Sequence, residues 1–457
     1  MKHLLWIALG LLGIGYSSSS LARSNTACDA DTSAPVAGFI CGQPELRRLE
    51  RQLDRLALRA RQANGPALAR DQANWQAETV ATGWQALSQD LRPLQNLRQR
   101  YRARLAYLRA RLDPPPASKA ANAIQQTSAA MLGSAPPGAD VLDMLARSGI
   151  ARPAEAYAPH HHASPVAALD ALDVRASPAL RDRLERELGS LHVTSRALWA
   201  PNAHLGVVYQ TQGSAHCFYG VWFVAPAGQP AQPINTPNLI DSVEDGRSAC
   251  GSSSAHLMTL QGQPYLLRRD AISLDQTDLQ MQPWQQDHWG RAAHIVLRFD
   301  HHLGAARTLH RDDTDDEFWA RLAAPLAQAF DKHPAPGFTD VTLSTAQRVR
   351  FERMRQHARE SGDDVAPLAD TAPGGGPIGP YRGFADSAVY FPAPSSQGLL
   401  LGRIGRGHIG WRTGSDWLLG FWREAANGTL QPAASVTVER RRGAFLGAAV
   451  LPQAPRN

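Results

Sequence analysis

The sequence predicts an α+β protein, built from an N-terminal disulfide-stapled antiparallel helical bundle, a linker, and a mainly antiparallel β unit with helical insertions. Three observations support this fold class. Leucines recur at helical spacing between Pro44 and Leu112, and a segment rich in alanine and proline follows. Aromatic and β-branched runs bounded by Gly, Pro and Asn then dominate the second half of the chain. At 457 residues, the chain has room for two or three domains.

Residues 1–22 have the three parts of a secretory signal peptide. Lys2 precedes an apolar run from Leu4 to Tyr16, and small residues suited to signal peptidase follow up to Ala22. The apolar run is about a dozen residues long, shorter than the ~20 that span a bilayer. We therefore expect a cleaved signal peptide and a periplasmic or secreted mature chain without a transmembrane segment.

All four cysteines follow the predicted signal peptide, so each would reach an oxidising compartment where disulfides form. Four cysteines allow three pairings, and the sequence alone leaves these open. Because each pair would then lie within one compositional segment, we favour Cys28 with Cys41 and Cys217 with Cys250. The zinc-binding spacing C-x-x-C is absent, and we expect neither a metal nor another cofactor.

Three helices are expected in the predicted helical domain, residues 24–112. The first runs from Pro44 to Gln62, where proline suits the first turn and leucines form one apolar stripe. The run Asn64-Gly65-Pro66 ends it. A second helix is predicted from Ala67 to Leu87, and a third from Leu94 to Leu112 with roughly heptad spacing, as in an antiparallel bundle.

Composition divides the rest of the chain. Alanine, proline, serine and glycine dominate after the helices, which predicts a linker. Strand-like runs then appear in two stretches, and the last one is small for an independent core, so we expect both to share one β unit. The expected boundaries are 113–188 for the linker, 189–305 for a β-rich domain, 306–365 for a helical connector, 366–380 for a Gly/Pro linker and 381–455 for a second β-rich segment.

Positive charge is concentrated in the helical region. The formal net charge is +6, and residues 28–112 contain 14 arginines against 8 acidic residues, a surplus of 6. Four arginines recur at every fourth position and so form a row on one helix: Arg47, Arg51, Arg55 and Arg59. Such a row suits carboxylates or phosphates. A solvated face, partly neutralised by Glu50 and Asp54, is the other interpretation, and it is the one that this pattern more often has.

Aromatic residues near the C-terminus form a second binding candidate. Trp411 and Trp417 lie close to Trp422 in the second β-rich segment, and exposed tryptophans of this kind stack on ligands such as sugars. Alternating positions on strands are more often part of a core, and this is the interpretation that we favour.

Three further runs carry groups that bind metal ions. Histidines occur at residues 160–162 and 301–302, and acidic residues occur within 312–317. Adjacent histidines on a strand point to opposite faces, and the acidic run lacks the glycine and the terminal glutamate of a calcium loop. We expect solvated histidines and an acidic cap on a helix that begins near Phe318, with no metal site.

The sequence lacks the common catalytic motifs. It contains no nucleophile elbow, H-E-x-x-H zinc motif, phosphate loop or dinucleotide fingerprint. Residues 251–254 with His256 come nearest to a serine site, but a polar turn after Cys250 explains them better. We therefore favour binding over catalysis. The alternative is a cell-wall hydrolase, or another periplasmic enzyme with its site in the β unit.

A set of short motifs runs through the helical region: Cys28 with Cys41, Ile40–Leu46, Leu49 and Leu53, Gln72–Trp75 with Glu78, and Tyr101–Leu105 with Leu108. With these motifs the region resembles the N-terminal domain of the LprI-type lysozyme inhibitor family. The resemblance implies a small cysteine-stapled helical module that binds a partner outside the cytoplasm. A second cysteine pair of the family is absent, with Thr82 and Trp84 near its expected first position. Either one disulfide stabilises the module alone, or Trp75 and Trp84 supply packing instead.

The favoured function is non-enzymatic binding at the cell envelope, either of a lysozyme-like hydrolase or of an anionic envelope polymer. A nucleic-acid partner is not expected. Many lysozymes are themselves basic, and like-charged surfaces slow encounter, so the arginine row does not favour the inhibitor hypothesis. A structural envelope protein without a ligand is a third class.

Overall fold

The structure is a computed structural model that describes residues 35–88, 92–115, 119–132, 145, 147, 151–153, 155–162, 164–189, 195–200, 204–212, 217–236, 253–260, 262–311, 315–332, 342–360, 389–395, 398–407 and 416–452. Within them, helices and antiparallel sheets are both extensive, which confirms the α+β class. The predicted signal peptide, Cys28, Cys250 and Trp411 lie outside the described residues. No helix of the described residues is long and apolar enough to span a membrane.

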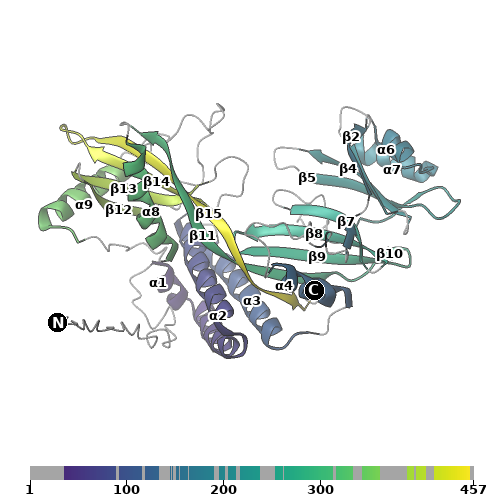
Figure 1. Ribbon diagram of the computed structural model, residues 1–457, viewed down its shortest axis with the longest axis horizontal. Coiled ribbons are helices and arrows are strands. Elements are labelled where there is room, and N and C mark those ends of the chain that lie inside the picture. The colour runs from purple at the N-terminus through teal and green to yellow at the C-terminus, as the bar shows by residue number, and fades with distance from the viewer. Residues whose placement is uncertain are drawn as a thin grey trace, which may run out of the picture.

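The N-terminal part is helical, with α1 (Pro35–Gly42), α2 (Pro44–Ser88) and α3 (Pro93–Leu112). At Gly65 the backbone leaves the helical region (φ 70°, ψ −160°), so α2 kinks where the sequence predicts a helix end. Helices α2 and α3 pack side by side (Figure 1). Their shared core contains leucines of the predicted apolar stripe and of the predicted heptad pattern: Leu46, Leu49, Leu53, Leu97, Leu105 and Leu108.

Cys41 lies at the end of α1 and is disulfide-bonded. Its partner lies outside the described residues, and the side chain of Cys217 does too, so both predicted pairings stay predictions. Of the two tryptophans expected to replace the second cysteine pair, Trp75 is buried against Tyr101, with ring centroids 5.4 Å apart. The side chain of Trp84 is outside the described residues.

The main sheet contains strands from both predicted β stretches. Its order in the described residues is β1-β7-β8-β9-β11-β15-β14-β13-β12, with β10 paired to β9. Strands β11 and β15 pair over most of their length and run diagonally through the molecule, joining its two halves (Figure 1). The bounds are β1 Ala151–Pro153, β7 Ser253–Leu260, β8 Gln263–Ser273, β9 Gln276–Gln285, β10 His288–Trp289, β11 Ala293–Arg311, β12 Val389–Ser395, β13 Gly398–Gly407, β14 Asp416–Glu424 and β15 Leu430–Leu451.

A second antiparallel sheet has the order β2-β3-β4-β5-β6 and is covered by two short helices. Its bounds are β2 Glu155–His162, β3 Ser195–Ala200, β4 Leu205–Gln212, β5 Cys217–Val224 and β6 Gln232–Pro233, and the helices are α6 (Pro165–Ala171) and α7 (Pro178–Leu188). Both helices begin with a serine cap before a proline, because Ser164 and Ser177 accept hydrogen bonds from Ala167 N and Leu180 N.

The segment predicted as a linker, 113–188, contains regular structure. It includes α4 (Lys119–Leu132) and the elements β1, β2, α6 and α7. Its alanine and proline content resembles that of a linker, yet small residues also allow close packing against a sheet. Ala121 and Ile124 of α4 are fully buried against the main sheet.

The predicted connector 306–365 is also partly sheet, because β11 continues to Arg311. Its two helices are α8 (Asp316–Lys332) and α9 (Thr345–Glu360). They cover opposite faces of the sheet, since alternate residues of β14 contact each: Leu419 packs with α8 and Leu418 with α9. This double cover explains why β14 is buried at successive positions from Trp417 to Trp422.

The helical region and the sheet share one core. Ile295 and Leu297 of β11 face α4, whereas Val296 and Ala449 belong to the core of α2 and α3. Gly447 in β15 has a φ of 154°, and a Cβ there would overlap the guanidinium of Arg111 on α3. The absence of a side chain at Gly447 therefore lets α3 approach β15 closely.

Candidate functional site

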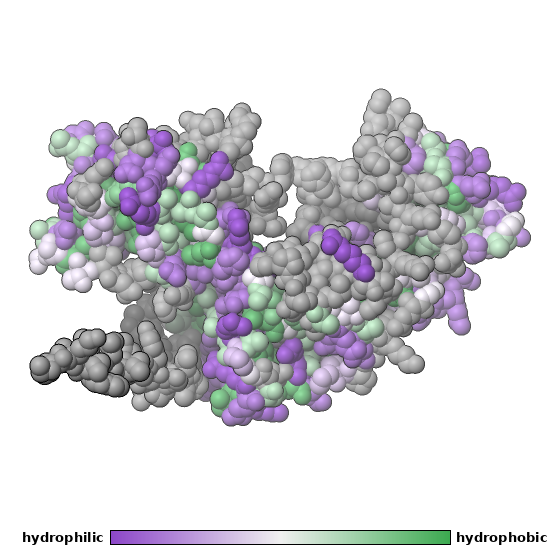
Figure 2. All heavy atoms as spheres, in the orientation of Figure 1, coloured by the Kyte–Doolittle hydropathy of each residue, from purple (hydrophilic) through white to green (hydrophobic). Residues whose placement is uncertain are grey.

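The arginine row lies on the outer side of α2. Arg47, Arg51, Arg55 and Arg59 are all exposed, and none forms an ion pair within the described residues. Positions four apart form a ridge along a helix and advance about 6 Å per step, so the four guanidinium groups follow the helix surface. Figure 2 shows strongly hydrophilic residues over the helical region at the bottom of the view.

The acidic residues of this part of α2 turn away from the row. Glu45 pairs with Arg98 and Arg102 of α3, at 2.6 and 3.0 Å. Glu50 is only 4% exposed and hydrogen-bonds Tyr101 of α3. Burial raises the pKa of Tyr101 well above its usual value, and the neighbouring carboxylates of Glu50 and Asp54 raise it further. The positive charge of the arginine row is therefore less neutralised than expected from the acidic residues that lie near it in the sequence.

Trp411 and Trp417 formed the second binding candidate. Trp417 is among the described residues and belongs to the core. Trp417 is 5% exposed and packs in the cluster between α8 and the sheet. Its indole N–H donates to Asp331 Oδ1 at 3.0 Å. This placement agrees with the core interpretation.

The histidine and acidic runs take structural positions where they are described. His301 is buried between Asp275 and Asp331, whereas His302 is exposed on the other face of β11. Asp315 accepts a hydrogen bond from Phe318 N at 2.8 Å and so caps α8, as predicted. Within the described ranges, no group of three His, Cys, Asp or Glu side chains is arranged to hold a metal ion.

A buried ion triad joins the helices to the sheet, and no sequence pattern predicts it. Asp71 of α2 accepts from Arg104 Nη1 of α3 at 3.0 Å and from Arg298 Nε of β11 at 2.7 Å. All three side chains are at most 4% exposed. Burial alone would raise the pKa of Asp71, but attraction to the two guanidinium groups outweighs it and the pKa is lowered.

Alternate side chains of β11 point towards the helices beside this triad. His294, Val296 and Arg298 alternate along β11 and therefore face the helices together. The register with β9 sets Asp278 opposite Val296 and Gln276 opposite Arg298. Gln276 Oε1 accepts from Arg298 Nη1 at 2.9 Å, and Asp278 Oδ2 lies 2.9 Å from His294 Nε2.

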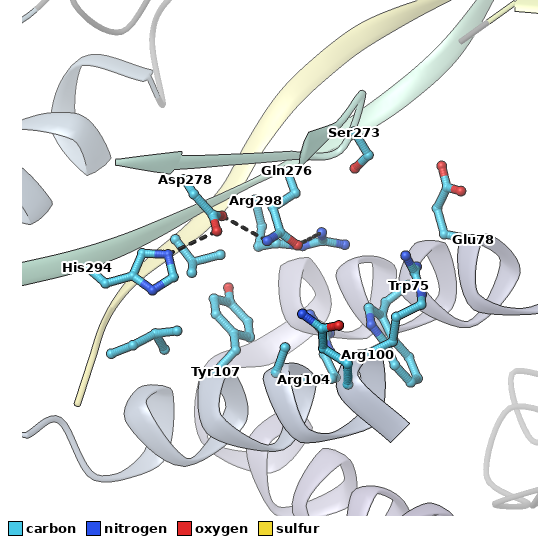
Figure 3. A pocket seen from close by; sticks show the side chains of 14 residues that line it. Trp75, Glu78, Arg100, Arg104, Tyr107, Ser273, Gln276, Asp278, His294 and Arg298 are labelled. Carbon is cyan, nitrogen blue, oxygen red and sulfur yellow. Dashed lines mark hydrogen bonds and ion pairs between the residues drawn. The ribbon is translucent and has the colours of Figure 1, made fainter. Parts of the chain in front are cut away.

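Beside the triad lies a cavity of about 260 Å³ between the helices and strands β9 and β11. Figure 3 shows side chains from both sides around it, with Tyr107 and Arg104 rising from α3 and Asp278, Gln276 and Arg298 on the sheet side. The apolar part of the lining includes Trp75, Val296 and Leu451. The exposed residues Gln99 and Ala103 lie at its rim.

Residues that line this cavity include buried donor atoms without a hydrogen-bond partner in the described residues, among them Arg104 Nη2, Arg298 Nη2 and Tyr107 Oη. Buried donors of this kind are costly for a folded protein and are uncommon. Sequence reasoning missed them because arginines at helical and strand positions read as surface residues.

No family model, curated protein or solved structure matches the chain.

Two arginine-rich features of the described residues are used below. We call them the arginine row (Arg47, Arg51, Arg55, Arg59) and the arginine cavity (the cavity lined by Arg104, Arg298 and Tyr107).

A second buried ion cluster lies nearby. His301 Nε2 lies 2.7 Å from Asp331 Oδ2, and Arg440 Nε donates to Asp331 Oδ1 at 2.8 Å. On the other side of the imidazole, Nδ1 is 3.4 Å from Asp275 Oδ1. Arg440 also lies 3.8 Å from Glu78 of α2, so this cluster ties α2, α8, β11 and β15 together.

The charges of this cluster shift the pKa values of its members. Burial alone would lower the pKa of His301, but hydrogen bonding to Asp275 and Asp331 raises it to about 9. Burial would raise the pKa of Asp331, but the hydrogen bond from His301 and the charge of Arg440 lower it to about 2. The imidazolium and the carboxylate are therefore both charged at neutral pH, as in a structural ion pair.

Proposed function

We propose that this protein is an exported binding protein that holds an anionic polymer of the cell envelope through the arginine row. The observation that carries the proposal is the exposure of four guanidinium groups on one ridge of α2, with the neighbouring acids engaged elsewhere. A planar guanidinium makes paired hydrogen bonds to carboxylate or phosphate, and a row of them matches a repeating anion.

A linear polyanion fits this surface better than a compact protein partner. Neighbouring arginines of the row are about 6 Å apart along the helix axis, a spacing that repeating charged units on a chain can follow. Binding would release counterions, so the affinity should fall as salt concentration rises. The row lies on a helix fixed by packing against α3 and the sheet, which reduces the entropy lost on binding.

The test uses the full mature chain and three immobilised polymers: polyglutamate, polyphosphate and neutral dextran. We expect binding to both anionic polymers, weakening with added salt, and no binding to dextran. Replacing Arg47, Arg51, Arg55 and Arg59 together by glutamine should weaken anionic-polymer binding by about tenfold or more, because single exposed charge pairs each contribute only ~0.2–1 kcal/mol.

A matched control removes the same charge from other surfaces. Arg181, Arg186, Arg321 and Arg348 are exposed on α7, α8 and α9, and glutamine at these four positions lowers the net charge equally. The control should retain nearly all binding. Equal losses in both fourfold variants would show that overall charge, not the row, governs binding, and would overturn the proposal.

Inhibition of a lysozyme-like hydrolase is the second candidate, favoured by the disulfide at Cys41 next to the helices that carry the family resemblance. We propose Cys28 as the partner of Cys41, stapling the chain before α1 to the bundle. The helical region shares its core with Val296 and Ala449, so the full chain is the correct reagent rather than a helical fragment. Muramidase activity that is unchanged at micromolar excess of the full chain would remove this candidate.

A further inference from the structure

The arginine cavity holds two guanidinium groups in fixed orientations. Arg104 uses Nη1 for Asp71 and Nε for Gln72, and Arg298 uses Nε for Asp71 and Nη1 for Gln276. Each group is therefore held by two hydrogen bonds in a site built from α2, α3 and β11. The Nη2 atom of each guanidinium remains without a partner in the described residues.

Tyr107 adds a third donor on the α3 side of the cavity. Its side chain is 3% exposed, and its hydroxyl has no partner in the described residues. The guanidinium carbon of Arg104 lies 5.0 Å from the centroid of the Tyr107 ring and 5.8 Å from that of Trp75, which packs the three side chains together. Burial raises the pKa of Tyr107, so the hydroxyl keeps its proton and can donate.

The local charge balance favours one negative charge. Asp71 is shared by two guanidinium groups, which leaves that triad one positive charge in excess. Of the other carboxylates near the cavity, Asp278 contacts His294 and accepts a hydrogen bond from Gln276, whereas Glu78 and Asp275 belong to the cluster of His301, Asp331 and Arg440. An anion with a single charge would balance the triad, whereas a dianion would also meet repulsion from Asp278 and Glu78.

From this geometry we infer that the arginine cavity binds the carboxylate of a small organic acid, with its oxygens on Arg104 Nη2, Arg298 Nη2 and Tyr107 Oη. The ligand body would lie against Trp75, Val296 and Leu451. A cavity of about 260 Å³ admits only a small molecule. The site is separate from the arginine row and does not depend on the polymer-binding proposal.

Calorimetric titration of the full mature chain with benzoate, benzamide and inorganic phosphate tests the inference. Benzoate and benzamide have nearly the same shape and differ in charge, whereas phosphate is largely a dianion at pH 7.5. We expect benzoate to bind, with benzamide and phosphate each about tenfold weaker or more. Equal binding of benzoate and benzamide, tighter binding of phosphate, or no binding of benzoate at millimolar concentration would overturn it.

Two variants locate the binding. Tyr107→Phe removes a hydroxyl that has no partner in the described residues, so it should keep the fold while lowering benzoate affinity about tenfold. Gln99→Glu adds a negative charge at the exposed rim and should weaken benzoate binding severalfold without touching the core. Wild-type affinity in both variants would contradict the assignment.

Matched controls separate this site from other parts of the protein. Tyr219→Phe makes the same chemical change on β5, away from the cavity, and should leave benzoate binding unchanged. The fourfold variant of the arginine row should also keep it. Because that variant is expected to lose polymer binding, the outcomes for the two sites are independent.

Discussion

Arg298 Nε donates a hydrogen bond to Asp71 Oδ1 over 2.7 Å, joining residues 227 positions apart in the chain. The bond connects α2 to β11 at the centre of the molecule, and Asp71 is 0% exposed. Since Asp71 also binds Arg104, one carboxylate determines how two helices dock on the sheet.

Replacing Asp71 by asparagine should strongly destabilise the fold. The change would leave two buried guanidinium groups without a counter-charge, and breaking a buried pair in this way costs about 3–5 kcal/mol. Urea unfolding measures the loss. Asp182→Asn on the exposed face of α7 is the control, and a loss below about 1 kcal/mol for Asp71→Asn would contradict a stabilising role for the triad.

The pair His301 and Asp331 predicts a definite pH dependence of stability. The pKa of His301 is raised from 6.5 to about 9, so its contribution is complete below pH 6.5 and is lost as pH rises through 9. The pKa of Asp331 is lowered from 3.8 to about 2, so its contribution is complete above pH 3.8 and is lost as pH falls through 2.

The free energy of unfolding lost in His301→Gln should therefore be largest between pH 4 and 6.5 and should shrink towards pH 9. Denaturant unfolding of wild type and variant at pH 5, 7 and 9 measures it. Exposed His302→Gln on the same strand should show no such trend. A His301→Gln loss that stays constant from pH 5 to 9 would contradict the raised pKa.

Trp417→Phe should destabilise the protein without affecting polymer binding. The change removes the hydrogen bond to Asp331, a bond to a charged group that is worth about 1.5–3 kcal/mol. Trp422→Phe on the same strand is the matched control, because its buried indole N–H has no hydrogen-bond partner in the described residues. Similar losses in both variants would assign the effect to packing alone.

Gly447→Ala should weaken the contact between α3 and β15. A Cβ at this position would overlap the guanidinium of Arg111 and would also strain the backbone, so a loss of about 1–3 kcal/mol is expected. Thermal unfolding measures it, with Gly42→Ala, where a Cβ meets nothing within 4 Å, as the control. Adding Arg111→Ala should recover part of the loss if the overlap is its cause.

Local pattern was enough for the regular elements. The leucine spacing located α2 and α3, and the helical connector predicted at 306–365 contains α8 and α9. Composition alone did not predict the helices and strands of residues 113–188. These elements depend on packing against sheets whose other strands come later in the sequence. The polar runs within β11 and β15 likewise concealed two long strands, because charged residues such as Arg298 and Arg440 have their partners in distant elements.

Local sequence was sufficient to predict the helix periodicity, the strand-rich second half, the acidic cap before α8 and the positions of the arginine row, since each depends on neighbours within a few residues. Packing of distant segments brings Glu50 to Tyr101, joins Asp71 to Arg104 and Arg298, and forms a cavity beside them. No local pattern predicts these contacts, because a buried charge needs a partner and here that partner comes from a distant part of the chain.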